Sequence, residues 1–303
     1  MRKSGVLMHI SSLPSPHGIG SMGKPARDFV DFLDKAGQAY WQILPVCPTS
    51  YGDSPYQSFS TFAGNPYFID LDTLVEEGVL DKKDCEKVNW GKKPDEVDYE
   101  KIYKGRYPLL RKAYENSDIS KNPDYQKFVA ENSWWLSDYA LFMALKSHFN
   151  NVSWGEWETD IKFRKPEAMS RYEEQLSDDI GYWKFIQFEF YLQWNALKQY
   201  ANSNGIEIIG DIPIYMGYDS VDVWANQGEF QLDENLTPIK VAGVPPDAFS
   251  DAGQKWGNPL YDYDKMEANG FSWWRKRMAA SAKLYDVIRI CLLYTSDAAD
   301  DLT

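Results

Sequence analysis

Two residues of opposite charge lie at the ends of predicted buried strands, where the strands would reach solvent. Asp211 follows the apolar run 206–209, and Arg289 lies near the end of the apolar run 285–290. In barrel enzymes this end of a strand is where the chemistry usually sits. An arginine almost inside a buried strand needs a carboxylate partner, and Asp211 is the nearest one by topology. Asp211 is therefore expected either to hold Arg289 and accept sugar hydroxyls, or only to cap a loop or a helix.

A segment rich in prolines and aromatic residues is the second candidate. Residues 243–261 are interpreted as a long loop that combines Phe249, Gln254, Trp256 and Asn258 with many turn formers. Loops of this kind often cover a site that a rigid scaffold carries. We therefore expect this segment to lie over the candidate site.

The glycine pattern GIGSMG at 18–23 matches G-x-G-x-x-G but favours a plain loop. A dinucleotide site needs its first glycine at the end of a strand and an acidic residue closing the next strand. Here seven residues separate Ile10 from Gly18, and the next predicted strand closes on residues 45–47, none of which is acidic.

The histidines and cysteines favour structural roles over a metal or redox site. His9 lies inside a predicted strand, His148 lies on a predicted helix among apolar neighbours, and His17 is the third histidine. No Gly-x-Ser-x-Gly motif offers a hydrolase nucleophile. The cysteines lack metal or redox spacing, which suits a reducing compartment; they are Cys47, Cys85 and Cys291.

Four short apolar segments predict the buried strands that would position these side chains. They span residues 5–10, 40–46, 206–215 and 285–290. A helix is predicted between the first two strands, over 24–37.

The pattern of that helix indicates how it packs. Phe29, Phe32 and Leu33 are predicted to share one face of this helix, and Gly37 ends it.

Between the second and third strands the sequence becomes charged and helical, from about residue 72 to 204. Apolar residues recur at helical spacing over 131–149 and 181–205. This order predicts parallel βα units in an α/β fold. A closed (β/α)8 barrel needs eight strands and about 250 residues. With roughly 130 residues in the helical block, the chain has room for about half a barrel.

Composition limits the classes of partner. The net charge of −13 disfavours nucleic acid, which needs clustered Lys and Arg. No apolar stretch reaches the length of a membrane span, and the first residues are too weakly apolar for a signal peptide, so we expect a cytoplasmic protein. Twelve Trp and 20 Tyr indicate a large aromatic core, or a cleft in which flat sugar faces stack on rings.

Five ordered stretches of this sequence resemble the 4-α-glucanotransferases, called amylomaltase in bacteria and disproportionating enzyme in plants. The resemblance spreads over residues 1–290 and rests on SSLPSPHGIGSMG, YWQILPVCPTSYGDSPYQSFSTFAGNPYFIDL, GDIPIYMGYDSVDVW, GVPPDAFSDAGQKWGNPLYDY and YDVIRI.

The resemblance implies an α-amylase-type (β/α)8 TIM barrel with large helical insertions and no metal or organic cofactor. Family members transfer α-1,4-glucan segments between maltooligosaccharides or starch-derived glucans, by a retaining double displacement through a covalent glycosyl-enzyme intermediate. Such chemistry needs a carboxylate nucleophile and a second carboxyl as acid/base, about 5–5.5 Å apart. The expected partners are α-1,4-glucans and maltooligosaccharides, with no membrane and no obligate protein partner.

Family roles carry over to particular positions. Asp211 matches the acid that supports the reacting sugar, and Arg289 matches the arginine two positions before the nucleophile, which it should hold ionised. Ala248 departs from the aromatic residue of many relatives. The residues that match the cleft loop are Ser54, Pro55, Tyr56 and Gln57, and those that match the lid over the sugars are Asp247, Phe249, Gln254, Trp256 and Asn258.

The nucleophile position is where this sequence departs most from the family. Relatives continue with Asp-His-Phe-Arg-Gly, and Cys291 stands in place of that aspartate. We therefore expect a C-terminally truncated chain that is inactive alone, with only about half of the barrel and a non-native tail. The expected parts are the first barrel segment 1–71, the helical insertion 72–204, the continued barrel 205–290 and the tail 291–303.

Two other functions stay open. A non-catalytic, truncated paralogue that keeps the aromatic cleft would bind maltooligosaccharides without transfer. A related retaining α-glucan hydrolase would release free glucose from maltotriose rather than longer oligosaccharides.

Overall fold

The chain folds around a four-stranded parallel sheet. The computed structural model describes residues 2–50, 52–91, 93, 95–246 and 251–291. Its sheet has the strand order β1-β2-β3-β6, with every neighbouring pair parallel. The strands are β1 (Gly5–Leu7), β2 (Tyr40–Gln42), β3 (Glu207–Pro213) and β6 (Val287–Cys291). The four predicted strands are confirmed.

The first two strands are shorter than predicted. The chain leaves β1 after Leu7 and enters a 3-10 helix at Ile10–Ser12. His9 therefore lies outside the strand, and its buried ring meets Phe68 edge-on, with 5.2 Å between ring centroids. Burial lowers the pKa of His9 to about 4, because the charged imidazolium loses its hydration.

Helix α1 (Lys24–Lys35) connects β1 with β2 and packs on the sheet through a narrower face than predicted. Its buried residues are Ala26, Val30 and Leu33, which recur at the spacing of one helix face. Phe32 is 56% exposed and is not among these buried residues. Its ring stacks on that of Phe29, with 6.0 Å between ring centroids.

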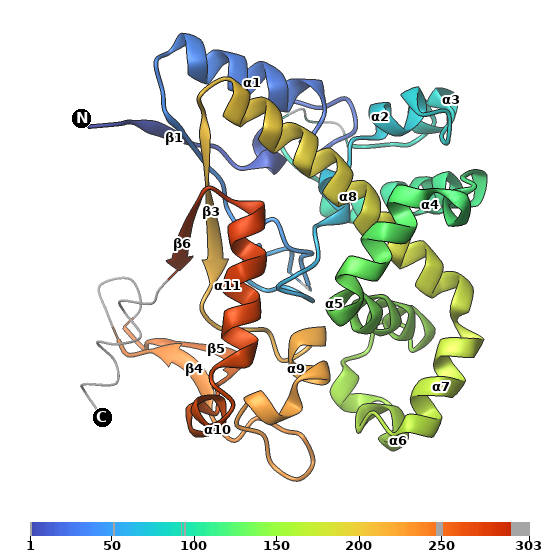
Figure 1. Ribbon diagram of the computed structural model, residues 1–303, viewed down its shortest axis with the longest axis vertical. Coiled ribbons are helices and arrows are strands. Elements are labelled where there is room, and N and C mark those ends of the chain that lie inside the picture. The colour runs from blue at the N-terminus through green and yellow to red at the C-terminus, as the bar shows by residue number, and fades with distance from the viewer. Residues whose placement is uncertain (1, 51, 92, 94, 247–250, 292–303) are drawn as a thin grey trace.

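After a loop that follows β2, helices make up most of the chain up to β3. They are α2 (Leu71–Glu76), α3 (Lys82–Glu86), α4 (Tyr99–Asn116), α5 (Pro123–His148), α6 (Thr159–Lys162), α7 (Pro166–Gln175) and α8 (Ser177–Ser203). Helices α5 and α8 pack together, and α8 runs from this block back to α1 and the sheet (Figure 1). The two predicted apolar helices are therefore confirmed as the central pair of the helical block.

Two glutamines on α8 hold the chain that enters this block. Gln187 accepts the backbone N–H of Gly64 at 2.7 Å and donates to its carbonyl at 2.9 Å. Six residues further along, Gln193 accepts the N–H of Asp70 at 2.6 Å and donates to its carbonyl at 3.3 Å. Each side-chain amide thus satisfies a buried backbone pair that has no strand neighbour.

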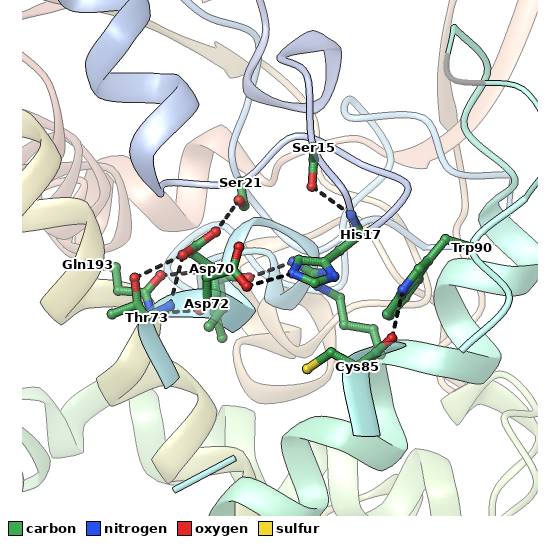
Figure 2. Close-up of polar contacts among 11 residues, drawn as sticks. Ser15, His17, Ser21, Asp70, Asp72, Thr73, Cys85, Trp90 and Gln193 are labelled. Atoms are coloured by element: carbon green, nitrogen blue, oxygen red, sulfur yellow. Dashed lines mark hydrogen bonds and ion pairs between the residues drawn. The ribbon is translucent and has the colours of Figure 1, made fainter. Parts of the chain in front are cut away.

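The glycine pattern at 18–23 packs against protein groups. Ser21 Oγ donates to Asp70 Oδ1 at 2.6 Å, and His17 Nε2 lies 3.1 Å from Asp72 Oδ1 (Figure 2). A Cβ added at Gly23 would lie 2.4 Å from the Asp70 carboxyl group. Protein atoms therefore take up the space that a dinucleotide phosphate would need, as the plain-loop interpretation predicts.

The segment after β3 contains a hairpin that was not predicted. Strands β4 (Val241–Val244) and β5 (Gln254–Pro259) pair in antiparallel fashion, so the interpretation of 243–261 as one long loop is wrong. Pro245 and Pro246 interrupt the strand pattern between them, which hides the alternation of the hairpin. Helix α9 (Val221–Ala225) precedes the hairpin, helices α10 (Tyr263–Ala268) and α11 (Ser272–Leu284) follow it, and α11 contacts β6.

Short 3-10 helices at Pro66–Phe68, Ile119–Lys121, Trp154–Glu156 and Gln227–Glu229 complete the described elements. Among the described residues, no helix combines the length and apolar character needed to cross a membrane.

Candidate functional site

The two predicted charged residues meet at the carboxyl end of the sheet. Asp211 on β3 and Arg289 on β6 are register partners, and Arg289 Nη1 lies 3.0 Å from Asp211 Oδ2. The Asp211 side chain is fully buried, whereas that of Arg289 is 51% exposed. One partner of the ion pair is therefore held in the sheet and the other reaches toward solvent.

The start of β6 is aligned by an acidic residue that precedes it. Asp286 Oδ2 accepts the backbone N–H of Ile208 at 2.8 Å and the Asn202 side-chain amide at 2.9 Å. These bonds tie the entry of β6 to β3 and to the end of α8. They fix the register that brings Arg289 opposite Asp211.

Tyr56 supplies a second donor to the buried carboxylate. Its hydroxyl donates to Asp211 Oδ2 at 3.0 Å. A turn presents Tyr56: the Gln57 N–H donates to the Ser54 carbonyl at 3.1 Å, and the Tyr56 N–H donates to Ser54 Oγ at 3.3 Å. The cleft loop and β3 thus contribute to one cluster although they lie far apart in the sequence.

Burial dominates the acidity of this carboxyl group. It raises the pKa of Asp211 above its ordinary value, and the hydrogen bond from Tyr56 and the charge of Arg289 lower it in part. Asp211 Oδ1 is buried and has no hydrogen-bond partner among the described residues.

Cys291 ends β6 beside this cluster, in register with Pro213. Burial, followed by the negative charge of Asp211, raises the pKa of its thiol, while Arg289 lowers it. The neutral thiol is therefore favoured, and a neutral thiol is a poor nucleophile.

The hairpin contributes the opposite side of the site. Gln57 Nε2 donates to Asn258 Oδ1 at 3.2 Å, which joins the cleft loop to β5. On the same strand, Trp256 Nε1 donates to Gln254 Oε1 at 3.1 Å. In Figure 1 the β4–β5 hairpin is drawn beyond the arrowheads of β3 and β6.

Of the predicted residues, the structure brings Tyr56, Asp211 and Arg289 together and joins Gln57 to Asn258. Asp247, Ala248 and Phe249 lie outside the described residues. No cluster of three or more histidine, cysteine or acidic side chains in the described ranges is arranged to hold a metal ion.

Three buried polar residues behind the site were missed. Asp222, Tyr261 and Arg277 are almost entirely shielded from solvent. Their sequence surroundings resemble any amphipathic segment, so only the fold shows that they converge.

A parallel sheet with a polar cluster at the carboxyl ends of its strands defines an α/β protein with its site at that edge. A sequence profile of the 4-alpha-glucanotransferase family matches residues 8–291, and the chain belongs to this family.

Similar proteins extend beyond the matched region. The 4-alpha-glucanotransferase of Clostridium butyricum is 55% identical over 284 residues, which cover 93% of this chain and 58% of the relative. That of Streptococcus pneumoniae (strain R6) is 52% identical over 291 residues, with coverage of 95% and 58%. The chain therefore spans less than two thirds of the length of these relatives.

Two solved structures share the fold of this chain. The amylomaltase from Streptococcus agalactiae in complex with acarbose is 46% identical, with a TM-score of 0.92, over 96% of this chain and 59% of that one. The amylomaltase from Corynebacterium glutamicum shares the fold, with a TM-score of 0.74 at 18% identity over 95% of this chain and 40% of that one.

Proposed function

We propose that this chain forms one side of the glucan-binding cleft of a 4-α-glucanotransferase that transfers α-1,4-glucan segments with retention of configuration. The cluster of Tyr56, Asp211 and Arg289 at the carboxyl end of the sheet carries this proposal. It combines a buried acceptor, a hydroxyl and a cation, which are groups that recognise sugar hydroxyls.

Each residue has a distinct role in this proposal. The unpartnered Oδ1 of Asp211 accepts a hydroxyl of the reacting sugar, because a buried acceptor gains most from a new donor. Tyr56 and Arg289 hold the carboxylate through its other oxygen. The family resemblance gives Arg289 a further role, in keeping the nucleophile ionised.

The lid residues contact the sugars on either side of the scissile bond. Trp256 offers a ring for the C–H face of a glucose unit, and Gln254 and Asn258 offer amides to its hydroxyls. The resemblance extends this role to Asp247 and Phe249, and it places Ser54 and Gln57 along the wall of the cleft.

The chemical step needs groups that these residues do not provide. A retaining mechanism uses two carboxyl groups about 5–5.5 Å apart. The described residues that interact with Asp211 include Tyr56, Arg289 and Cys291, and none of these three is a carboxylic acid. With Cys291 at the nucleophile position, the proposal is that the 303-residue chain binds glucan without transferring it.

The same proposal includes the wider architecture. The four parallel strands form half of a closed (β/α)8 barrel of the α-amylase type, with the helical block as an insertion. No metal or organic cofactor takes part, and α-1,4-glucans are the partners. The net charge of −13 supports the absence of nucleic acid, and a cytoplasmic location without an obligate protein partner completes the proposal.

Isothermal titration of the chain with acarbose tests the proposed site. We expect saturable binding that weakens at least about tenfold in Asp211→Asn, because the buried acceptor loses its charge. Trp256→Ala should weaken binding by a similar factor, whereas exposed Phe32→Ala should not. Equal affinity in all variants would refute the site.

Incubation with maltotriose separates the remaining functions. Binding without new products identifies a non-catalytic glucan-binding chain, the alternative that Cys291 favours. Longer oligosaccharides would indicate transfer despite Cys291. An excess of free glucose over longer products would indicate a hydrolase.

A further inference from the structure

A buried arginine lies directly behind the carboxyl end of β3. Arg277 on α11 is fully buried, and its guanidinium group donates to the backbone carbonyls of Pro213 and Ile214, the latter at 3.2 Å. Pro213 is two residues beyond Asp211, at the point where the chain leaves the sheet. Buried carbonyls at a strand end need donors from elsewhere, and here one planar side chain serves two of them.

A residue just after the β4–β5 hairpin also binds the carbonyl of Ile214. Tyr261 follows β5 and is also fully buried. Its hydroxyl donates to the Ile214 carbonyl at 2.7 Å and lies 3.5 Å from Arg277 Nη1. Tyr261 lies three positions after Asn258, the hairpin residue that contacts the cleft loop.

Asp222 on α9 links the cleft loop to this region. Burial raises the pKa of Asp222 to about 7, and the nearby charge of Arg277 lowers it in part. Its Oδ2 accepts the backbone N–H of Thr61 at 2.7 Å, in the loop that also carries Tyr56. Strand β3, the hairpin and the cleft loop are thus held from one buried location that no ligand would touch.

We propose that Arg277 and Tyr261 are positioning residues that set the placement of the β5 side chains relative to Asp211, and thereby the affinity of the cleft for an α-glucan. This inference rests on the proposed function. A ligand that spans Asp211 and Trp256 binds well only when both walls are already in place, because ordering a loose hairpin on binding costs affinity.

The most specific variant is Tyr261→Phe. It removes the hydroxyl and keeps the ring, which packs between Phe230 and Trp273 with centroids 5.3 and 5.6 Å away. We expect the dissociation constant for acarbose to rise about three- to tenfold, with little change in melting temperature. Backbone amides of residues 254–258 should also exchange with deuterium faster in the absence of ligand.

Tyr218→Phe is the matched control. Its hydroxyl donates to the Leu236 carbonyl at 2.9 Å, so it also removes one hydroxyl–carbonyl bond from the segment after β3. That bond does not connect the hairpin with Asp211. We expect unchanged acarbose affinity and unchanged exchange in β5. In Arg277→Lys, one ammonium group replaces the planar pair of donors, and we expect the effects of Tyr261→Phe to recur.

The two measurements distinguish failure of this inference from failure of the proposed function. If acarbose binds, equal affinity in Tyr261→Phe and the original chain overturns the positioning role. If acarbose does not bind the original chain, the proposed function fails. The hydrogen exchange of the β5 amides then tests the positioning role by itself. Faster exchange of β5 in Tyr261→Phe but not in Tyr218→Phe then supports the positioning role, and unchanged exchange overturns it.

Discussion

Asp211 combines properties that a surface carboxylate lacks. It is buried, two donors converge on one of its oxygens, and the other oxygen has no partner among the described residues. Burial raises its pKa while its neighbours lower it. Small changes in those neighbours should therefore shift its ionisation, and with it the binding of a sugar.

Tyr56→Phe tests this balance. Removing the hydroxyl takes away the largest influence that lowers the pKa of Asp211, so the pKa should rise further. Because the ionised carboxylate is the better acceptor, affinity for acarbose should be lost as pH falls. In Tyr56→Phe that loss should begin at a higher pH than in the original chain. Coincident pH profiles of affinity, measured by titration calorimetry, would contradict this expectation.

Glu189 is a buried acid on helix α8. Burial, and to a smaller extent the charge of Glu77, raise its pKa to about 8. A folded-state pKa above the unfolded value means that the stability gained at low pH is lost as pH rises toward 8. Between pH 7 and 9 we expect the unfolding free energy to fall by about 1 kcal/mol from this group.

Urea denaturation at pH 7 and pH 9 measures the effect. Glu189→Gln should flatten this part of the profile, and Glu77→Gln should reduce the loss by removing one repulsive charge. The pKa of His9, about 4, leaves that ring neutral throughout this range. If the unfolding free energy of Glu189→Gln depends on pH as in the original chain, other groups cause the loss.

At the scale of elements, the strands of the parallel sheet could be predicted from apolar runs in the sequence, whereas the β4–β5 hairpin could not. Asp211 and Arg289 each follow or end an apolar run, so their pairing could be inferred from parallel topology. The contact between Gln57 and Asn258 joins residues 201 positions apart. It depends on the β4–β5 pairing, which neighbouring prolines conceal. The convergence of Tyr261 and Arg277 depends on how α11 packs, for which no local pattern exists.

Helix α8 offers a test of how such elements are held. Gln187 is fully buried and satisfies both backbone groups of Gly64. Gln187→Met keeps the volume but leaves a buried N–H and a buried carbonyl unpaired, at a cost of about 2–4 kcal/mol in unfolding free energy. Gln126→Met, at an exposed position that donates to the Ser120 carbonyl, should change stability by less than about 1 kcal/mol. Similar urea midpoints for the two variants would count against a stabilising role for the two bonds between Gln187 and Gly64.

For the whole molecule, the described sheet leaves its outer strands with one neighbour each. Leu7 on β1 is 54% exposed and Val287 on β6 is 40% exposed. Parallel edge strands with apolar side chains are templates for pairing with another chain. The net charge of −13 opposes association only at long range and is screened by salt.

Val287→Lys tests whether these edges drive self-association. A charge on the edge should lower the fraction of oligomers at high protein concentration, as measured by sedimentation velocity, without a large change in melting temperature. Ile239→Lys replaces a residue that is 62% exposed and lies outside the sheet, so it controls for added charge. Equal reduction by both substitutions would exclude an edge-specific effect.

The paired glutamine clamps also limit how the length of this chain can change in evolution or by design. Gly64 with Gln187 and Asp70 with Gln193 are both 123 positions apart. The segment 64–70 and the stretch 187–193 of α8 therefore have the same number of residues between their two points of contact. Inserting or deleting residues between 71 and 186 leaves this alignment intact. A single insertion within 64–70 or 187–193 would move one clamp while the other stays, so indels should accumulate in the helices between these windows and be excluded from both.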